Sequence, residues 1–271
     1  MKKSAHSYPI PPNSVYVWRG FKSASLNYAQ FTAFLGTVFV PACVQLQPPI
    51  GLRAYLPSMV PQGNKPAAVP DQTALMFWRT PAAHDEAKVA LAERIYSNLH
   101  GDVYDMTRST LQEVPKPLDA ASGALQPEQP YYLLDGEADW MQGVVHHLVG
   151  ARRPDLNTND FLTGAATWAK ALRQKPPRGV DAGLVCCGND YAVAWLHGTA
   201  NSKALQSALD PLAKLTQPVL NADAHAISMG AGLWDDWAGL DLSSFPCLNF
   251  QFSRPRNAKP KQQMKQKRRG K

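Results

Sequence analysis

Two kinds of residue pair in this sequence have the types and spacing to act on a small molecule. His146 and His147 are adjacent within an apolar stretch, and His197 lies two residues after Trp195 in a later one. An unperturbed imidazole titrates near neutral pH, so a histidine that faces an enclosed space can act as an acid or a base. A single histidine on an apolar strand is also a common hydrogen-bonded core residue, and the sequence leaves both readings open.

The second kind of pair combines a cation with a phenol, or a thioether with an indole. Arg53 and Tyr55 lie two residues apart, as do Met76 and Trp78. Side chains at i and i+2 of a strand share one face, so each pair points to one side of a sheet. The candidate catalytic residues are therefore Arg53, Tyr55, His146 and His147. The candidate ligand-pocket residues are Trp18, Met76, Trp78, Trp195 and His197.

The sequence predicts no cofactor and no metal. Its four cysteines show neither a C-x-x-C pair nor a zinc-type Cys/His spacing, and the phosphate-loop and dinucleotide-binding motifs are absent. Cys186 and Cys187 would point to opposite sides of a strand, which strains any disulfide between them. The stretch Trp234–Trp237 encloses two aspartates. This arrangement suits either a binding site for a sugar or a cation, or a pair of aromatic side chains that hold a surface loop against the body of the protein.

The first half of the chain reads as strand, helix, two strands, helix and strand. Residues 15–22 are β-branched and aromatic, and an apolar stripe at helical spacing follows a cap at Ser25 and ends at Pro41. Strands are predicted over 51–60 and 73–80. Thr80-Pro81 then opens a helix whose predicted buried stripe begins at Val89, and a short strand is predicted over 103–106.

The pattern restarts after a Pro-rich stretch. Strands are predicted over 143–152, 181–187 and 191–197, with a helix after Asn157 and another through Leu205–Leu215. A longer loop region is predicted over 218–246. Strict alternation of apolar and polar residues predicts a last strand over 248–252. Each half therefore reads as a ferredoxin-like βαββαβ unit, whose sheet needs cover on both faces.

The first half carries a resemblance to a known superfamily. Phe39-Val40-Pro41 precedes Gly51-Leu52-Arg53-Ala54-Tyr55, and Ala74–Arg79 with its helix follows. These segments resemble the helix, strand and hairpin partner of EthD-type members of the dimeric α/β-barrel superfamily. The resemblance implies an α+β protein in which two ferredoxin-like repeats, fused in one chain, pack sheet to sheet as an intramolecular α/β barrel. It also implies a small hydrophobic ligand between the sheets, sometimes haem, with many members acting without a cofactor.

The predicted domain organisation follows from these patterns. It consists of a flexible lead-in (1–14), a first repeat (15–109), a linker (110–138), a second repeat (139–254) and a disordered basic tail (255–271).

The formal charge of +7 comes from the end of the chain. Residues 254–271 hold nine basic and no acidic residues, which leaves 19 basic and 21 acidic residues in the rest. Such a segment stays solvated and can bind nucleic acid without sequence preference, or an anionic surface. The polyanion-binding candidates are Lys265, Lys267, Arg268 and Arg269. No apolar run approaches the roughly 20 residues of a membrane span, and no secretory signal is evident, so we expect a cytoplasmic protein.

Two functions compete at this stage. One is a cofactor-independent oxidoreductase or lyase that acts on a small apolar or aromatic compound. The other is a non-catalytic binding or assembly protein, tethered to nucleic acid or an anionic surface by its tail. The sequence does not decide whether the protein is an enzyme, nor its oligomeric state.

Overall fold

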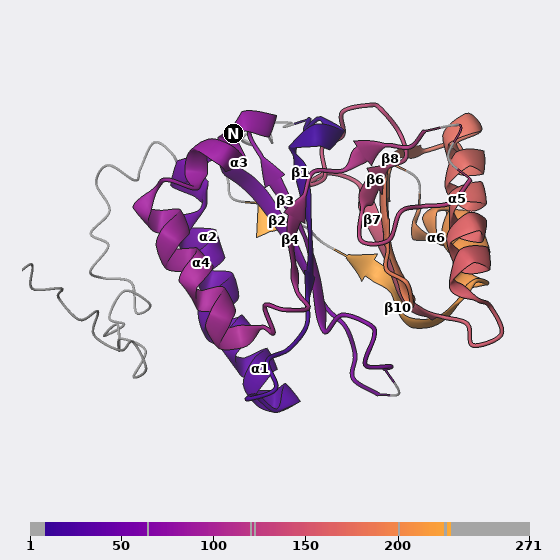
Figure 1. Cartoon of the computed structure of the whole chain (residues 1–271). Helices are drawn as coiled ribbons and strands as arrows, with labels where there is room; N and C mark the ends of the chain where they lie inside the picture. Colours follow the sequence, from indigo (N-terminus) through magenta and orange to yellow (C-terminus); the bar gives the residue numbers. More distant parts are fainter. Residues whose placement is uncertain are drawn as a thin grey trace, which may run out of the picture. The chain divides into compact units, whose positions relative to one another are not determined.

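The computed structural model describes residues 9–63, 65–119, 121, 123–199, 201–224 and 227–228. These residues belong to one compact unit, 1–238. The predicted strand 248–252, the Trp234–Trp237 stretch and the basic tail lie outside the described residues. Within the described part the chain is α+β, with two mixed layers of helix and sheet (Figure 1).

The first sheet has five strands in the order β11-β2-β3-β1-β4, and every neighbouring pair is antiparallel. Its strands are β1 (Val15–Gly20), β2 (Leu52–Met59), β3 (Gln72–Trp78), β4 (Thr110–Glu113) and β11 (Ile227–Ser228). All residues of β1 and β3 are buried. Both faces of this sheet are therefore covered, which fits its near-continuous apolar and β-branched sequence.

The helix after β1 is longer than predicted. Asn27, not Ser25, caps it, and its side chain and that of Gln30 form a reciprocal capping box. The helical segment runs through α1 (Tyr28–Phe34), a π-helical turn (Leu35–Phe39) and α2 (Val40–Leu46). In the wide turn the Val40 amide donates to the Leu35 carbonyl. Because this turn accommodates a proline, Pro41 does not end the helix as predicted.

The helix after β3 is broken in two. Thr80 caps α3 (Pro81–Ala87), as Thr80-Pro81 predicted, and α4 (Leu91–Val103) follows after a break. Val89 lies in that break with 75% of its surface exposed, so it does not belong to the buried stripe predicted for it. Within 103–106, Tyr104 makes only an isolated bridge to Lys22, and the fourth strand of this sheet is β4 instead. Helices α1 to α4 cover one face of the first sheet (Figure 1).

The second sheet has six strands in the order β10-β7-β9-β8-β6-β5. Its strands are β5 (Lys116–Pro117), β6 (Pro130–Tyr132), β7 (Val144–Arg152), β8 (Val180–Cys187), β9 (Tyr191–Gly198) and β10 (Thr216–Ala224). Helices α5 (Thr158–Gln174) and α6 (Ser202–Ala213) pack on one face around a core that includes Phe161, Trp168 and Leu209. Asn157 caps α5, in agreement with the prediction.

The two halves share one connection order. The four principal strands lie in the order β4-β1-β3-β2 in the first sheet and β10-β7-β9-β8 in the second. A single core joins them, because it contains Val17 and Leu75 of the first sheet together with Val149 and Val193 of the second. The helix-free faces of both sheets therefore contribute to one apolar interior.

The chain also crosses between sheets at both edges. β4 ends the first sheet on one side and leads to β5, which ends the second sheet. β10 ends the second sheet on its other side and leads to β11, at the opposite edge of the first. Residues 110–138, predicted to be a linker, thus carry β4, β5 and β6, and part of the predicted loop region is strand β10.

One helical segment has the length and composition to cross a membrane. It is Tyr28–Ile50, with 23 residues and an 18-residue window whose mean hydropathy is 1.5, so the expectation that no apolar run approaches this length was wrong. Its stripe Phe31, Leu35 and Phe39 packs in the core, but only 28% of its most apolar window is buried.

Candidate functional site

His147 is a buried neutral histidine between the two sheets. It lies on β7 with 1% of its surface exposed, and its Nδ1–H donates to the carbonyl of Ala194 at 3.0 Å. Nε2 then accepts from the Thr73 hydroxyl of the first sheet at 2.9 Å. Burial lowers the pKa of His147 to about 3, which the hydrogen bond to Ala194 only partly opposes. The ring is therefore an uncharged acceptor throughout the physiological range.

Trp195 completes the inner wall beside this imidazole. Its ring stacks on His147 with centroids 4.6 Å apart and an angle of 4° between the planes. The indole is fully buried, and its Nε1–H has no acceptor among the described residues. A buried donor without a partner costs on the order of 1–3 kcal/mol.

A cleft of about 340 Å³ opens at His147, between strand β2 of the first sheet and strand β10 of the second. Its lining is mostly apolar, with three polar side chains. The lining residues are Pro57, Ser58, Met59, His147, Leu220, Ala222, Asp223 and Ala224. A cleft of this size with few convergent polar groups is typical of small-molecule sites.

His146, on the opposite face of β7 from His147, contacts Asp223, one of the residues that line the cleft. Its Nδ1–H donates to Asp223 at 2.8 Å, and its Nε2–H donates to the amide oxygen of Asn221 at 2.8 Å. The Ser202 hydroxyl also donates to the Asp223 carboxylate, at 2.5 Å. Both ring nitrogens of His146 are therefore engaged by β10. Because Ser202 donates to Asp223, this is not the arrangement of a serine nucleophile and its base.

An ion pair that the sequence did not predict joins the halves on the opposite side, between a buried arginine and a partly exposed glutamate. Arg19 is fully buried, and its Nε donates to Glu128 Oε2 at 3.1 Å while Nη2 donates to the Glu128 carbonyl at 2.9 Å. Tyr191 donates to the same carboxylate at 2.7 Å. Glu128 has a φ of 65°, which turns its carbonyl and its carboxylate toward one guanidinium. The two partners are 109 residues apart, so no local signal could have found them.

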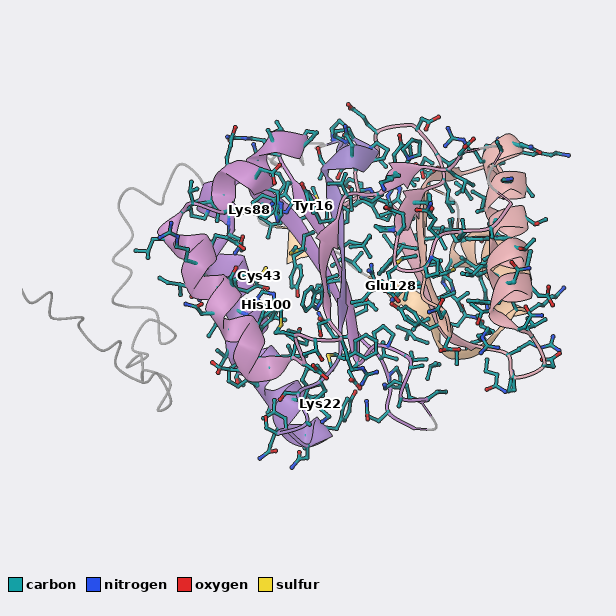
Figure 2. The ribbon with its side chains drawn as sticks, viewed as in Figure 1. Tyr16, Lys22, Cys43, Lys88, His100 and Glu128 are labelled. Carbon is teal, nitrogen blue, oxygen red and sulfur yellow. The ribbon has the colours of Figure 1, made fainter. Side chains whose placement is uncertain are left out.

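A second cleft, of about 250 Å³, lies against this ion pair. Glu128 and Tyr191 line it together with Phe21 and Arg108, whose guanidinium carbon is 4.1 Å from the Phe21 ring centroid. Figure 2 shows Glu128 on the opposite side of the first sheet from Cys43 and His100. The residues at this cleft hold each other, so we assign it a structural role.

Several predicted site residues lie instead on the helix-covered face of the first sheet. The Trp18 ring packs edge-on against His100 and Tyr104, and the Trp78 ring against His84. Tyr55 accepts from Gln72 at 3.3 Å on the same side. Burial raises the pKa of the Tyr55 phenol, and it lowers that of His100 to about 4. These groups therefore stay neutral, in a layer buried beneath the helices.

The other predicted site residues, Met76, Arg53 and His197, lie apart from one another. Met76 is buried and pairs with Tyr55 across the β2–β3 ladder. Arg53 is half-buried at a register shift in β2, where alternation no longer places it with Tyr55. His197 lies at the inter-sheet rim, where it donates to Asp181 at 3.1 Å and packs near Trp140. Of the nine predicted site residues in the body, the structure brings His147 and Trp195 together, with His146 reaching the cleft through Asp223.

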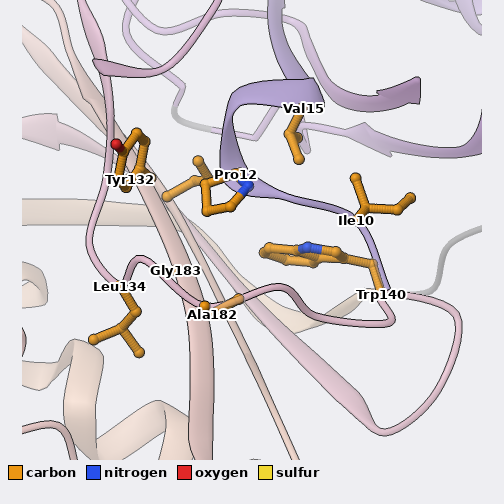
Figure 3. Close-up of a pocket in the computed structure, with 10 residues that line it drawn as sticks. Ile10, Pro12, Val15, Tyr132, Leu134, Trp140, Ala182 and Gly183 are labelled. Carbon is orange, nitrogen blue, oxygen red and sulfur yellow. The ribbon is translucent and has the colours of Figure 1, made fainter. Parts of the chain in front are cut away.

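A further inter-sheet gap among the described residues is too small for a ligand. It measures about 10 Å³ and lies among Ile10, Pro12 and Trp140, which converge on it in Figure 3. That volume is about the room one water needs. Cys186 and Cys187 are buried, reduced and on opposite faces, as predicted. The described residues contain no cluster of three metal-binding side chains. Lys265, Lys267, Arg268 and Arg269 lie outside the described part.

Comparisons with known proteins give distant structural matches. No protein-family model matches this sequence, and no curated protein does. A candidate monooxygenase from Lactobacillus acidophilus NCFM is 10% identical, with 83% of this chain and 98% of that chain aligned at a TM-score of 0.35. A candidate monooxygenase from Fusobacterium nucleatum subsp. nucleatum is 6% identical, with 82% and 94% aligned at a TM-score of 0.34. From similarities this distant no activity is carried over.

Proposed function

We propose that this protein binds a small apolar or aromatic compound in the cleft between β2 and β10, beside His147. The observation that carries this proposal is the cleft of about 340 Å³ that ends on a buried, neutral imidazole. Its apolar lining suits an aromatic or aliphatic body, and His147 defines the polar end of the ligand.

The polar end of that ligand is a hydroxyl or a similar group. Nε2 of His147 now accepts from Thr73, and a ligand hydroxyl can replace or share that donor at little cost. A phenol-like hydroxyl can donate that hydrogen bond to Nε2.

An oxidoreductase or lyase activity without a cofactor is the catalytic form of this proposal. With a pKa of about 3, His147 is too weak a base to exchange protons efficiently at neutral pH, so its role is to orient the ligand. We assign proton exchange to the His146–Asp223 pair, because Asp223 lines the cleft and its carboxylate accepts a hydrogen bond from the His146 ring. Arg53 and Tyr55 have no place in this scheme.

We also infer that the two halves are ferredoxin-like repeats fused into an intramolecular α/β barrel of the dimeric α/β-barrel type. Their identical strand order, the shared core and the chain crossings at both edges support this inference. A closed barrel removes both free sheet edges and leaves a ligand space at its mouth. We expect such a protein to act in the cytoplasm.

The cleft is tested by filling it. The probe is 1-naphthol, titrated into the purified chain by isothermal calorimetry. Ala222 lines the cleft and is exposed, so Ala222→Phe should occupy the space without straining the core, and binding should weaken at least about tenfold.

The matched control lies on the same strand. Gln217 is exposed on β10 and does not line the cleft, so Gln217→Phe should bind 1-naphthol as the unmodified chain does. Equal affinity in Ala222→Phe and Gln217→Phe would place the ligand elsewhere, and no binding to the unmodified chain would count against a phenol-like ligand.

A further inference from the structure

A row of polar side chains crosses the inner face of the first sheet beside the cleft at His147. Ser58 of β2 pairs with Thr73 of β3, which pairs in turn with Arg19 of β1. Residues directly opposite each other on antiparallel strands share one face, with their Cβ atoms about 4.5–5.5 Å apart. The next row on this face, two residues along each strand, is apolar and consists of Leu56, Leu75 and Val17. The polar row is therefore a local interruption of the core, and it begins at the cleft.

Thr73, in the middle of this row, occupies the acceptor that we assign to the ligand. It is fully buried, and its hydroxyl lies 2.9 Å from Nε2 of His147. Because the Nδ1–H of that ring donates to the Ala194 carbonyl at 3.0 Å, Nε2 has only a lone pair to offer. A single lone pair accepts one well-aligned hydrogen bond, so the Thr73 hydroxyl and a ligand hydroxyl exclude each other at this atom.

Ser58 offers a displaced Thr73 hydroxyl a new acceptor. Ser58 lines the cleft, and its side chain makes no hydrogen bond with the other residues that the structure describes. Since the two residues are directly opposite each other, rotation about the Thr73 Cα–Cβ bond brings its hydroxyl within hydrogen-bonding reach of Ser58 Oγ. The exchange therefore leaves no buried hydroxyl without a partner, which keeps its cost low.

We propose that Thr73 is an internal competitor for the ligand hydroxyl at His147 and thereby sets the specificity of the cleft. This inference rests on the binding site proposed above. A compound with a hydroxyl gains the hydrogen bond to Nε2 only by displacing Thr73, which lowers its affinity. A compound without a hydroxyl leaves Thr73 in place, and Nε2 keeps its donor. Thr73 thus narrows the difference in affinity between the two classes of compound, and it acts as a positioning residue because its effect passes through His147.

The test compares 1-naphthol with 1-methoxynaphthalene, which has the same rings and oxygen but no O–H group. Titrations that follow the fluorescence of each compound measure its affinity. In Thr73→Val the isosteric side chain has no hydroxyl, so Nε2 has no donor in the empty protein and only a ligand hydroxyl restores one. 1-Naphthol should bind Thr73→Val about tenfold more tightly than the unmodified chain, whereas the affinity for 1-methoxynaphthalene should stay the same.

Thr73→Ser is the matched control for this substitution. It keeps the hydroxyl and loses only a methyl group, so its affinities for both compounds should match those of the unmodified chain. A change in packing at Thr73 would alter the binding of both compounds together, which separates a structural role from competition. Circular dichroism checks that each variant keeps its fold.

Ser58→Ala tests where the displaced hydroxyl goes. In the unmodified background it should weaken 1-naphthol binding about fivefold, because the Thr73 hydroxyl loses its new acceptor. In the Thr73→Val background it should have no effect, because there is no hydroxyl to displace. A direct contact between Ser58 and the ligand would instead give the same loss in both backgrounds.

Two results would overturn the inference while leaving the proposed site intact. One is binding of 1-naphthol by Thr73→Val that is no tighter than binding by the unmodified chain. The other is an equal loss for Ser58→Ala in both backgrounds. If the unmodified chain bound neither compound, the proposed site and this inference would fall together.

Discussion

At the residue scale, two of the buried histidines, His100 and His147, make the stability of the fold depend on pH. Burial lowers the pKa of His147 to about 3 and that of His100 to about 4, whereas an unfolded histidine titrates near 6.5. Between these values the unfolded chain binds more protons than the folded one, so stability rises with pH across that window. It is lost as the pH falls from about 6.5 toward about 3.

The low pKa of His147 predicts that the unfolding free energy of the unmodified chain depends more strongly on pH than that of His147→Gln. From pH 7 to pH 5 the unmodified chain should lose about 2 kcal/mol more unfolding free energy than the variant, because the variant lacks one of the two groups that resist protonation. Urea unfolding at both pH values measures it. Equal losses in the two proteins would show that His147 is already protonated, or accessible to protons, in the folded state.

The Arg19–Glu128 pair predicts an asymmetric cost. Glu128→Gln removes the counterion of a guanidinium that is fully buried, and because the Glu128 carboxylate is itself 43% exposed we expect a loss of about 1–3 kcal/mol in unfolding free energy. Asp190→Asn serves as the control, since the Asp190 carboxylate is 51% exposed and its pairing with Arg152 contributes about 0–1 kcal/mol. Similar losses for both variants, in chemical denaturation, would contradict the assignment of Arg19 and Glu128 as the structural link.

At the element scale, two glycines should respond in opposite directions to the same substitution. Gly36 lies in a helical segment with open space at its Cβ position, so Gly36→Ala should raise the unfolding free energy by about 0.5–1 kcal/mol. A Cβ at Gly198 of β9 would lie 1.9 Å from the Gly179 carbonyl oxygen, so Gly198→Ala should lower the melting temperature. A gain in Gly198→Ala would show that the β8–β9 bulge can open.

The same scale shows why periodicity predicted some elements and missed others. Strands β1, β3, β8 and β9 and helix α5 were predicted because their apolar residues are continuous or recur at helical spacing. β10 was missed because it is a mostly exposed edge strand that contains Pro218, so it lacks an alternating pattern. β4, β5 and β6 are short and lie among prolines, and pairing with distant strands holds them in place.

At the scale of the whole molecule, the faces of the strands could not be assigned from the sequence. Helices cover one face of the first sheet and the second sheet covers the other, so both faces need apolar side chains and alternation carries little information. Tyr55 therefore lies under the helices, while His147 reaches the space between the sheets. The Arg19–Glu128 link and the cleft arise only when the two halves meet.

The most direct test of the account follows the His147 ring itself by ¹⁵N-edited NMR. The free protein should show a neutral imidazole with its proton on Nδ1 from pH 7 to pH 5. Addition of 1-naphthol should shift the His147 Nε2 resonance and leave that of His100, beneath the helices, in place. A charged His147 ring at pH 7, or a ligand that shifts His100 and not His147, would contradict the assignment of the inter-sheet cleft as the binding site.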